Sequence, residues 1–305
     1  MMFDVCVVGH IAKDIANTAN GEITMPGGTV YYTAIALKHL GMSVAVITKL
    51  RDQDTFLLSE LEKDHIPVFL GESDWTTTFM NVYSSDTNTR EQWVKDLARP
   101  FTVRDASRCE ARIFHLGPLT KDEIPLEVIR FLAGRARISL DVQGFVRDVV
   151  ERSRGWARVR HAAWKEKTSA LAFVNIVKAN EEEARMLSRE RDMRKIAIEL
   201  SNYGPEEVVI TRGSKSSLVY SKGKSYWVPA YSPRNTVAVD PTGCGDTYMA
   251  GYLFYRERST KFDEVGKFAS MTASLKLERS SPFRGNEEDI RDFANAVGQP
   301  LPSMT

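Results

Sequence analysis

The sequence predicts an α/β fold with three layers, in which helices cover both faces of a mostly parallel central sheet. Two observations predict it: short apolar runs that each stop at a glycine or a polar residue, and helical patterns between most of them. Strands buried on both faces and joined by helices produce this alternation. The length of 305 residues, with 43% hydrophobic and 27% charged residues, is enough to bury a sizeable core.

The expected elements follow one another along the whole chain. The first strand is FDVCVVG, and a glycine turn then opens a helix within GGTVYYTAIALKHLG. Further strands are expected in SVAVITKL, ARIFHLG, RISLDVQG, LAFVNIVKAN and EEVVITRG, and further helices at 54–64, 122–133, 180–189 and 192–202. Since no internal repeat or low-complexity linker divides the chain, we expect one domain over residues 1–305.

Two segments break the alternation. Residues 11–25 are too polar for a core strand, and residues 76–94 alternate like a half-exposed hairpin with SSDTN as its turn. We expect segments at about 11–25 and 74–96 to pair into a small β-sheet outside the main one. A surface hairpin is the simpler interpretation, whereas a position beside the strand ends favours a lid over a site.

The charge balance and the cysteines limit the functional class. Lys and Arg number 41 against 40 Asp and Glu, which argues against nucleic acid or an anionic membrane as the main partner. Three distant cysteines without CxxC spacing fit a reducing, cytoplasmic compartment better than a disulfide framework or a zinc site. The amino terminus has no basic region like that of a signal peptide, and no apolar run approaches the ~20 residues of a membrane span.

The stretch VDPTGCGDTYMAG carries the chemistry. It is neither of two familiar phosphate loops: the GKS at 223–225 has Leu218 where a Walker A loop needs its first glycine, and Tyr248 replaces the third glycine of GxGxxG. What remains is a Gly-x-Gly turn that opens a helix, with Asp246 in or beside the first turn. Free backbone N–H groups at such a helix start bind anions, and glycine lets the backbone approach them closely.

Asp246 has two interpretations. A carboxylate beside a bound phosphate repels it, which makes sense if Asp246 takes a proton from an attacking hydroxyl, a role that contributes about 10²–10⁴ in rate. The simpler alternative is that Asp246 caps the helix and complements its dipole. The residues alone leave both open.

Five elements in order then resemble the ribokinase-like, or PfkB-type, carbohydrate kinases. VDPTGCGDTYMAG is similar to their C-terminal signature, and PGGTVYYTAIALKHLG to their N-terminal one; GHIAKD, KANEEEA and VITRGSKSSLVY match three further elements. Two positions depart from the family pattern. Pro241 replaces a Thr or Ser, and Ser216 replaces the last glycine of T-x-G-x-x-G.

The resemblance implies an ATP-dependent phosphotransferase with the following roles. Asp246 is the general base, and the amides of Gly243, Cys244 and Gly245 form the anion hole for the γ-phosphoryl group. Mg²⁺ is placed by Asn180 and Glu183 through waters, in keeping with an ion that dehydrates reluctantly. Relatives also carry a monovalent-cation site near this loop, so K⁺ is a candidate cofactor.

The same resemblance assigns the two ligand sides. Asn180, Thr211 and Gly213 are expected to contact the nucleotide, with Thr211 and Gly213 along its phosphates, and Asp14, Gly27 and Gly28 are expected to contact the substrate's other hydroxyls. Exposed lid strands pair between subunits in this family, so a homodimer through the lid is a candidate assembly.

The acceptor stays open between classes. LDVQGFVR and the Tyr-Tyr helix start look like the myo-inositol kinase branch, so Gln143 and Arg147 would face a sugar or polyol, together with Arg90. Arg147 fits a solvated helix residue equally well. Tyr31 and Tyr32 could instead stack on a nucleobase, which would make the chain a nucleoside kinase. A non-catalytic sugar- or nucleotide-binding protein is the remaining alternative.

Overall fold

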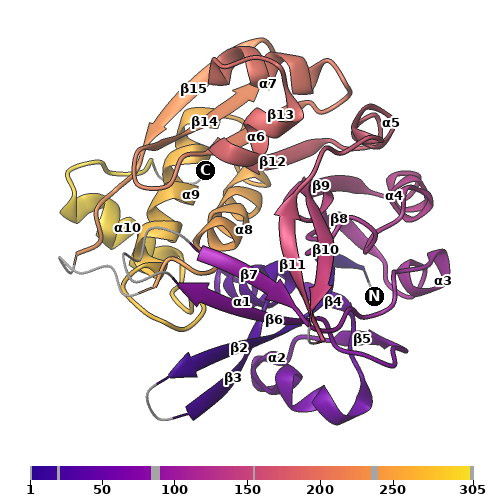
Figure 1. Cartoon of the computed structure of the whole chain (residues 1–305). Helices are drawn as coiled ribbons and strands as arrows, with labels where there is room; N and C mark the ends of the chain where they lie inside the picture. The colour runs from indigo at the N-terminus through magenta and orange to yellow at the C-terminus, as the bar shows by residue number, and fades with distance from the viewer. Residues whose placement is uncertain (1, 19–20, 84–89, 154, 235–239, 303–305) are drawn as a thin grey trace.

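A mostly parallel sheet forms the centre of the chain (Figure 1). The computed structural model describes residues 2–18, 21–83, 90–153, 155–234 and 240–302. Within them, nine strands pair in the order β15-β14-β13-β12-β9-β8-β1-β4-β5. Their bounds are β1 Phe3–Val8, β4 Val44–Lys49, β5 Val68–Gly71, β8 Ala111–Leu116, β9 Arg137–Asp141, β12 Ile176–Asn180, β13 Glu207–Thr211, β14 Ser216–Ser221 and β15 Lys224–Pro229.

The strands from β5 to β13 run parallel, and β14 and β15 extend the sheet as an antiparallel hairpin. The central strands are apolar on both faces because both faces are covered. In β1, Val5 and Val7 pack into one hydrophobic cluster, whereas Cys6 and Val8 pack into another on the opposite face. This alternation places the two cores on the two sides of a single sheet.

The first hydrophobic cluster takes its helical residues from α1, η1, α2, α8, α9 and α10, and the second takes them from α3 to α7 and from η2. Figure 1 shows α8, α9 and α10 on one side of the sheet and α3, α4 and α5 on the other. The bounds are α1 Thr29–His39, η1 Asp52–Leu58, α2 Ser59–Lys63, α3 Val103–Ala106, α4 Leu126–Ala133, η2 Gly144–Val146, α5 Lys167–Leu171, α6 Glu181–Leu187, α7 Met193–Ser201, α8 Cys244–Arg256, α9 Phe262–Lys276 and α10 Glu287–Ala296. The predicted three-layer α/β architecture is confirmed.

A second sheet leaves the main one at its carboxyl edge. Six described strands pair in the order β10-β11-β7-β6-β2-β3, with bounds β2 Ala12–Thr18, β3 Gly21–Gly27, β6 Thr78–Tyr83, β7 Arg90–Val94, β10 Arg147–Ser153 and β11 Trp156–His161. Segments 11–25 and 76–94, singled out by sequence, supply β2, β3, β6 and β7. The SSDTN turn lies outside the described residues. Strands β10 and β11 have no counterpart in the sequence analysis.

Two predicted helices have different bounds in the structure. The segment 54–64 begins as the 3₁₀ turn η1 and becomes α-helical only in α2. The helix expected over 122–133 begins at Leu126, because the chain before it folds around the carboxylate of Glu123. That carboxylate accepts the backbone N–H groups of His10 at 2.6 Å and Leu119 at 2.8 Å.

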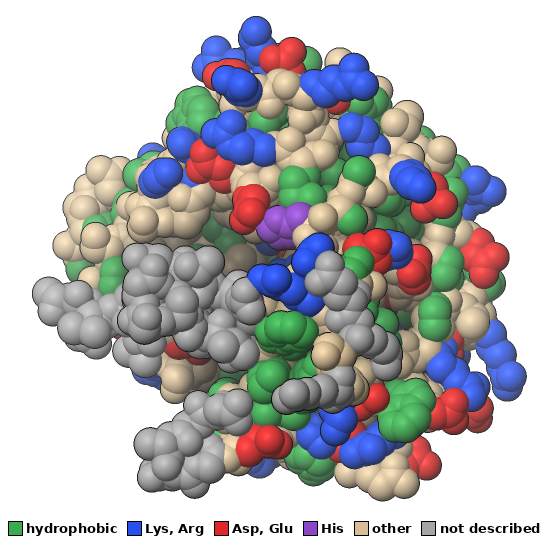
Figure 2. Space-filling model, viewed as in Figure 1, with side chains coloured by type: hydrophobic (Ala, Val, Ile, Leu, Met, Phe, Trp, Pro, Cys, Tyr) green, Lys and Arg blue, Asp and Glu red, His purple; other side chains and the backbone are tan. Residues whose placement is uncertain are grey.

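Two features of the fold concern the expected absence of a membrane or nucleic-acid partner: the length of the helices and the distribution of surface charge. None of the helices in the described part of the chain is both long and apolar enough to cross a bilayer. On the face shown in Figure 2, Lys and Arg side chains are interspersed with Asp and Glu rather than gathered into a field of one sign.

Candidate active site

In the turn before α8, steric constraints explain why each of the two positions is a glycine. Gly243 is the residue before the helix and has φ 77°, in the left-handed region that favours glycine. A Cβ there would lie 2.4 Å from the ring of Tyr32, and a Cβ on Gly245 would lie 3.2 Å from the Lys178 Nζ. The two glycines therefore let an aromatic ring and an ammonium group approach the turn.

Hydrogen bonds define which amides of the turn are free. The Cys244 N–H donates to the Pro241 carbonyl at 3.2 Å, and the Thr242 N–H donates to Asp240 Oδ1 at 2.8 Å. The amides of Gly243 and Gly245 have no acceptor among the described residues. Of the three amides that the resemblance assigns to an anion hole, that of Cys244 is therefore already used inside the turn. Pro241 supplies its carbonyl to this bond, so the departure from the family pattern leaves the turn intact.

Asp246 lies in the first turn of α8, half-buried beside other charged groups. Burial and then the Asp141 carboxylate raise the pKa of Asp246 to about 6, although Lys178 and Arg147 oppose the change. A carboxylate with this pKa is largely deprotonated at pH 7 and still accepts a proton readily. Such a side chain is poised to act as a general base.

Two charged residues that the sequence analysis missed hold this region together. Lys178 Nζ lies 2.7 Å from Asp141 Oδ2, and both side chains are almost fully buried. Burial lowers the pKa of Lys178, but the carboxylates of Asp141, Glu183 and Asp246 outweigh it and raise that pKa overall. A charged residue inside the apolar run LAFVNIVKAN was the available signal, since lysine is rarely buried without a partner.

Asn180 and Glu183 form the capping box at the start of α6. Asn180 Oδ1 accepts the Glu183 N–H, and Glu183 Oε2 accepts the Asn180 N–H, both at 2.8 Å. Burial is the main reason that the pKa of Glu183 is raised. The cap uses one of the two carboxylate oxygens of Glu183, which lies near Lys178 and Asp141. The Asn-x-x-Glu spacing in the sequence is therefore that of a capping box, and this structural role is compatible with a second one.

The site fits a divalent cation held partly by other groups. No three His, Cys, Asp or Glu side chains gather closely enough to hold a metal by themselves in the part of the chain that is described. However, Asp141, Glu183 and Asp246 share one buried ammonium, that of Lys178. The excess negative charge favours Mg²⁺ that takes its remaining ligands from waters and donor phosphates. When bound, Mg²⁺ would neutralise charge on a transferring phosphoryl group.

A cavity of about 400 Å³ adjoins the glycine turn. It is lined by Thr211 and Gly213 on one side and by Cys244 and Gly245 on the other, with Ser and apolar residues between them. Asn180 does not line it but is paired in register with Thr211 on the neighbouring strand. Tyr231, another lining residue, has a buried hydroxyl with no hydrogen-bond partner among the described residues.

The residues expected on the acceptor side converge on the same place from β2 and β3. Asp14 fills the space beside Gly27, where a Cβ would lie 2.0 Å from its Oδ2. Gly28 has φ 96°, and a Cβ there would meet the His10 carbonyl at 2.8 Å. Burial, and then Asp14, Asp240 and Asp246, raise the pKa of Tyr32, so these three carboxylates lie near one phenol.

The remaining expected acceptor residues lie on the path from β9 to the second sheet. The Gln143 N–H donates to Asp141 Oδ1 at 3.0 Å. Arg147 begins strand β10, so its alternative as a helix residue is wrong, and its charge lowers the pKa of both Asp246 and Glu183. Arg90 begins β7, and its side chain lies outside what the structure describes.

Comparison with known proteins identifies the family. A family model described as "pfkB family carbohydrate kinase" matches residues 2–289, almost the whole chain. The chain belongs to the PfkB family. It is therefore a kinase, which confirms the predicted enzyme class and rules out the non-catalytic alternative.

Individual PfkB relatives differ in what they phosphorylate. The chain is 27% identical to the cytidine kinase of Thermococcus kodakarensis over 272 residues, 86% of this chain and 92% of the relative. It also resembles a solved pyrophosphate-dependent kinase of the ribokinase family, with a TM-score of 0.81, 28% identity and coverage of 92% and 97%.

Another solved structure is of a pyrophosphate-dependent kinase in the ribokinase family complexed with a pyrophosphate analog and myo-inositol. It gives a TM-score of 0.80, 26% identity and coverage of 92% and 97%. The ribokinase-like fold predicted from the sequence is thus confirmed, and the chain is a sugar or nucleoside kinase of this family.

Proposed function

We propose that the protein transfers the γ-phosphoryl group of ATP to a hydroxyl of a sugar or polyol, with Asp246 as general base. The observation that carries the proposal is the position of Asp246. It lies in the first turn of α8, directly after Gly245, which lines the 400 Å³ cavity, and beside the amides of Gly243 and Gly245, which have no acceptor among the described residues. A base and an anion-binding turn are thus adjacent, as phosphoryl transfer requires.

In this mechanism, Asp246 accepts the proton of the acceptor hydroxyl as its oxygen attacks phosphorus. The amides of Gly243 and Gly245 donate to the transferring phosphoryl group, and one such donor contributes ~3–4 kcal/mol. The ammonium of Lys178, close to Gly245, adds positive charge below the turn. Asn180 and Glu183 would hold Mg²⁺ through waters, while Asp14, Gln143 and Arg147, with Arg90, orient the acceptor.

The cavity favours ATP over pyrophosphate as donor. Pyrophosphate carries several negative charges in a small volume, so a site for it needs Lys or Arg side chains. No charged residue lines this cavity among the described residues, and about 400 Å³ suits a nucleoside. The pyrophosphate-dependent relatives make the donor a question for experiment.

The acceptor side favours a polyol. Asp14 and Arg147 give it ionic groups suited to several hydroxyls. The stacking argument for a nucleoside is weakened, because Tyr31 and Tyr32 are buried, pack edge to face on each other at 5.2 Å, and Tyr32 also packs on Gly243. The similarity to cytidine kinase keeps a nucleoside as the second candidate.

A homodimer through the second sheet is the assembly that we propose. Strand β3 lies at the edge of that sheet, and Ile23 and Met25 on it are each 47% exposed. An edge strand with exposed apolar residues favours pairing with another chain. Sedimentation velocity over a range of concentrations would show a dimer, and a species of 34 kDa at all concentrations would contradict it.

The function is tested by a matrix of donors and acceptors. ATP, GTP and pyrophosphate are each incubated with Mg²⁺ and with myo-inositol, ribose, fructose, cytidine or adenosine, and phosphorylated products are measured by ³¹P NMR. We expect ATP with a polyol or sugar to give the highest kcat/KM, and the Asp246→Asn protein serves as background. Turnover with pyrophosphate alone would overturn the donor assignment, and turnover with nucleosides alone would overturn the acceptor assignment.

A further inference from the structure

The last residue of α9 carries a buried ammonium group. The side chain of Lys276 is 0% exposed, and its Nζ donates to the carbonyl of Asp240 at 2.9 Å and to the carbonyl of Arg279 at 3.2 Å. Asp240 Oδ2 lies 3.8 Å from the same nitrogen. A buried lysine persists only where oxygen atoms replace its water, and here three of them do.

These oxygens join two segments that are distant in the sequence. Asp240 opens the glycine turn and accepts the Thr242 N–H, whereas Arg279 belongs to the turn that follows α9. The ammonium also lies 5.8 Å from the centre of the Tyr32 ring, which packs on Gly243. Lys276 therefore contacts the first residue of the anion-binding turn, Asp240, without lining the donor cavity.

The described residues do not fit a separate monovalent cation at this point. K⁺ would require carbonyl and carboxylate oxygens at the base of the turn. The carbonyls of Asp240 and Arg279 already accept the Lys276 ammonium, and Asp240 Oδ2 is paired with it at 3.8 Å. An ammonium group has the same charge as K⁺ and a similar size. The position is thus filled by the protein itself.

We propose that Lys276 is a tethered cation that positions the Asp240–Gly243 turn, so that the enzyme needs no K⁺ for phosphoryl transfer. Lys276 is a positioning residue, because it acts on the donor phosphate only through the turn. The inference rests on the proposed kinase mechanism at the turn. It goes beyond that mechanism in two ways: it gives Lys276 a role, and it predicts that activity does not depend on K⁺.

The test is chemical rescue of the Lys276→Met variant, which keeps an unbranched side chain one atom shorter and removes the ammonium group. Activity is measured with KCl, NH₄Cl or tetramethylammonium chloride at equal ionic strength. Wild type should change less than twofold among the three salts. The variant should lose about tenfold to a hundredfold in kcat/KM, as expected for lost bonds to a charged group. K⁺ and NH₄⁺ should restore at least fivefold, and tetramethylammonium, which is too large, should restore nothing.

A matched control is Lys267→Met, on the same helix but only partly buried. It should keep wild-type activity in all three salts. Thermal unfolding provides a readout without turnover: KCl and NH₄Cl should raise the Tm of the Lys276→Met protein more than tetramethylammonium chloride does, and should not do so for wild type or Lys267→Met.

Several results would overturn the inference. They are activation of wild type by K⁺ of fivefold or more, full activity of the variant without K⁺ or NH₄⁺, or a folded variant that neither ion restores. If Lys276→Met does not fold, the wild-type salt series still decides, because strong activation by K⁺ contradicts a filled site. If wild type phosphorylates no acceptor, the proposed function fails, while the salt-dependent Tm still tests the cation position.

Discussion

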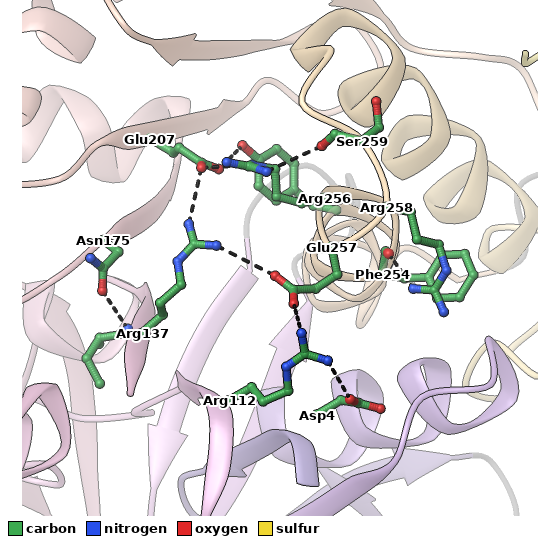
Figure 3. A network of polar contacts seen from close by, with 12 residues as sticks. Asp4, Arg112, Arg137, Asn175, Glu207, Phe254, Arg256, Glu257, Arg258 and Ser259 are labelled. Atoms are coloured by element: carbon green, nitrogen blue, oxygen red, sulfur yellow. Dashed lines mark hydrogen bonds and ion pairs between the residues drawn. The ribbon is translucent and has the colours of Figure 1, made fainter. Parts of the chain in front are cut away.

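Charged side chains are arranged differently at the two ends of the main sheet's strands, here called the amino edge and the carboxyl edge. Helix α8 runs from the carboxyl edge to the amino edge. At the amino edge, where α8 ends, arginines and carboxylates are paired one after another (Figure 3). Glu207 accepts Tyr252 Oη at 2.7 Å and Arg256 Nε at 2.9 Å, and Arg137 lies 3.4 Å away. Arg137 and Arg112 continue the network through Glu257 to Asp4.

At the carboxyl edge, where α8 begins, carboxylates exceed their cation. Among the described residues, Asp141, Glu183 and Asp246 lie near the ammonium of Lys178, and Arg147 is the other cation that acts on Asp246 and Glu183; the pKa values of Asp246 and Glu183 are nevertheless raised. Paired charges contribute to stability. A carboxylate with few cations nearby has a raised pKa and therefore accepts a proton more readily. Under the proposed mechanism, one end of the sheet serves stability and the other serves chemistry.

The largest expected effect is that of Asp246→Asn. Loss of the base should lower kcat by about 10²–10⁴ with donor affinity retained. The folded protein holds the Asp246 proton more tightly than the unfolded chain does, so deprotonation costs stability as pH rises from about 4 through 6. The variant should therefore be more stable at pH 7, by about 1–2 kcal/mol, an advantage that disappears towards pH 4.

Steady-state kinetics and urea unfolding at pH 7 and pH 4.5 measure both parts. Asp263→Asn is the matched control, since Asp263 is also in the first turn of a helix but is exposed. It should change neither quantity. A kcat within a few-fold of wild type for Asp246→Asn would remove the general-base assignment.

The next largest effect is expected for Lys178→Met, which removes the ion pair with Asp141 at the carboxyl edge. It leaves the buried carboxylate of Asp141 without its partner at 2.7 Å, which should cost about 3–5 kcal/mol of stability. Urea unfolding measures the loss. The double variant Asp141→Asn/Lys178→Met should recover a large part of it, because no charge is then left unpaired; equal stability of the single and double variants would contradict the pairing.

Glu207→Gln tests the amino edge. It keeps the shape of the side chain but weakens its bonds to Tyr252 and Arg256, so the free energy of unfolding should fall by about 1–3 kcal/mol while kcat stays within twofold. Arg112→Ala, on a 59% exposed side chain of the same network, should cost only about 0–1 kcal/mol. A large loss of kcat with unchanged stability in Glu207→Gln would invalidate the division between edges.

The last expected effect is on the pH profile. With the pKa of Asp246 at about 6, kcat/KM should fall below pH 6 and be about tenfold lower at pH 5 than on the plateau. Arg147 lowers that pKa, so Arg147→Gln should move the acid limb to higher pH. Glu207→Gln should leave the limb in place. A rate independent of pH between 5 and 8 would argue against Asp246 as the base.

The fold and the glycine turn could be predicted because their signals lie within short stretches. Apolar runs such as FDVCVVG form buried strands wherever helices cover both faces, and Gly243 to Asp246 are consecutive, so their order alone places an acid at a helix start. The capping box of Asn180 and Glu183 was visible for the same reason. By contrast, β10 and β11 carry mixed charged and apolar residues without a clear period, and the pairing of β11 with β7 is not local.

By itself, the sequence determined the layered fold, the kinase class and the turn that presents Asp246, since each depends on residues close together in the chain. Only the tertiary structure decided which charges surround that turn. Lys178 meets Asp141 across neighbouring strands, and Lys276 meets Asp240 from the end of α9, 36 residues away in sequence. Electrostatic environment depends on distance and burial in the folded chain, so the raised pKa of Asp246 and the tethered cation could not be predicted from spacing.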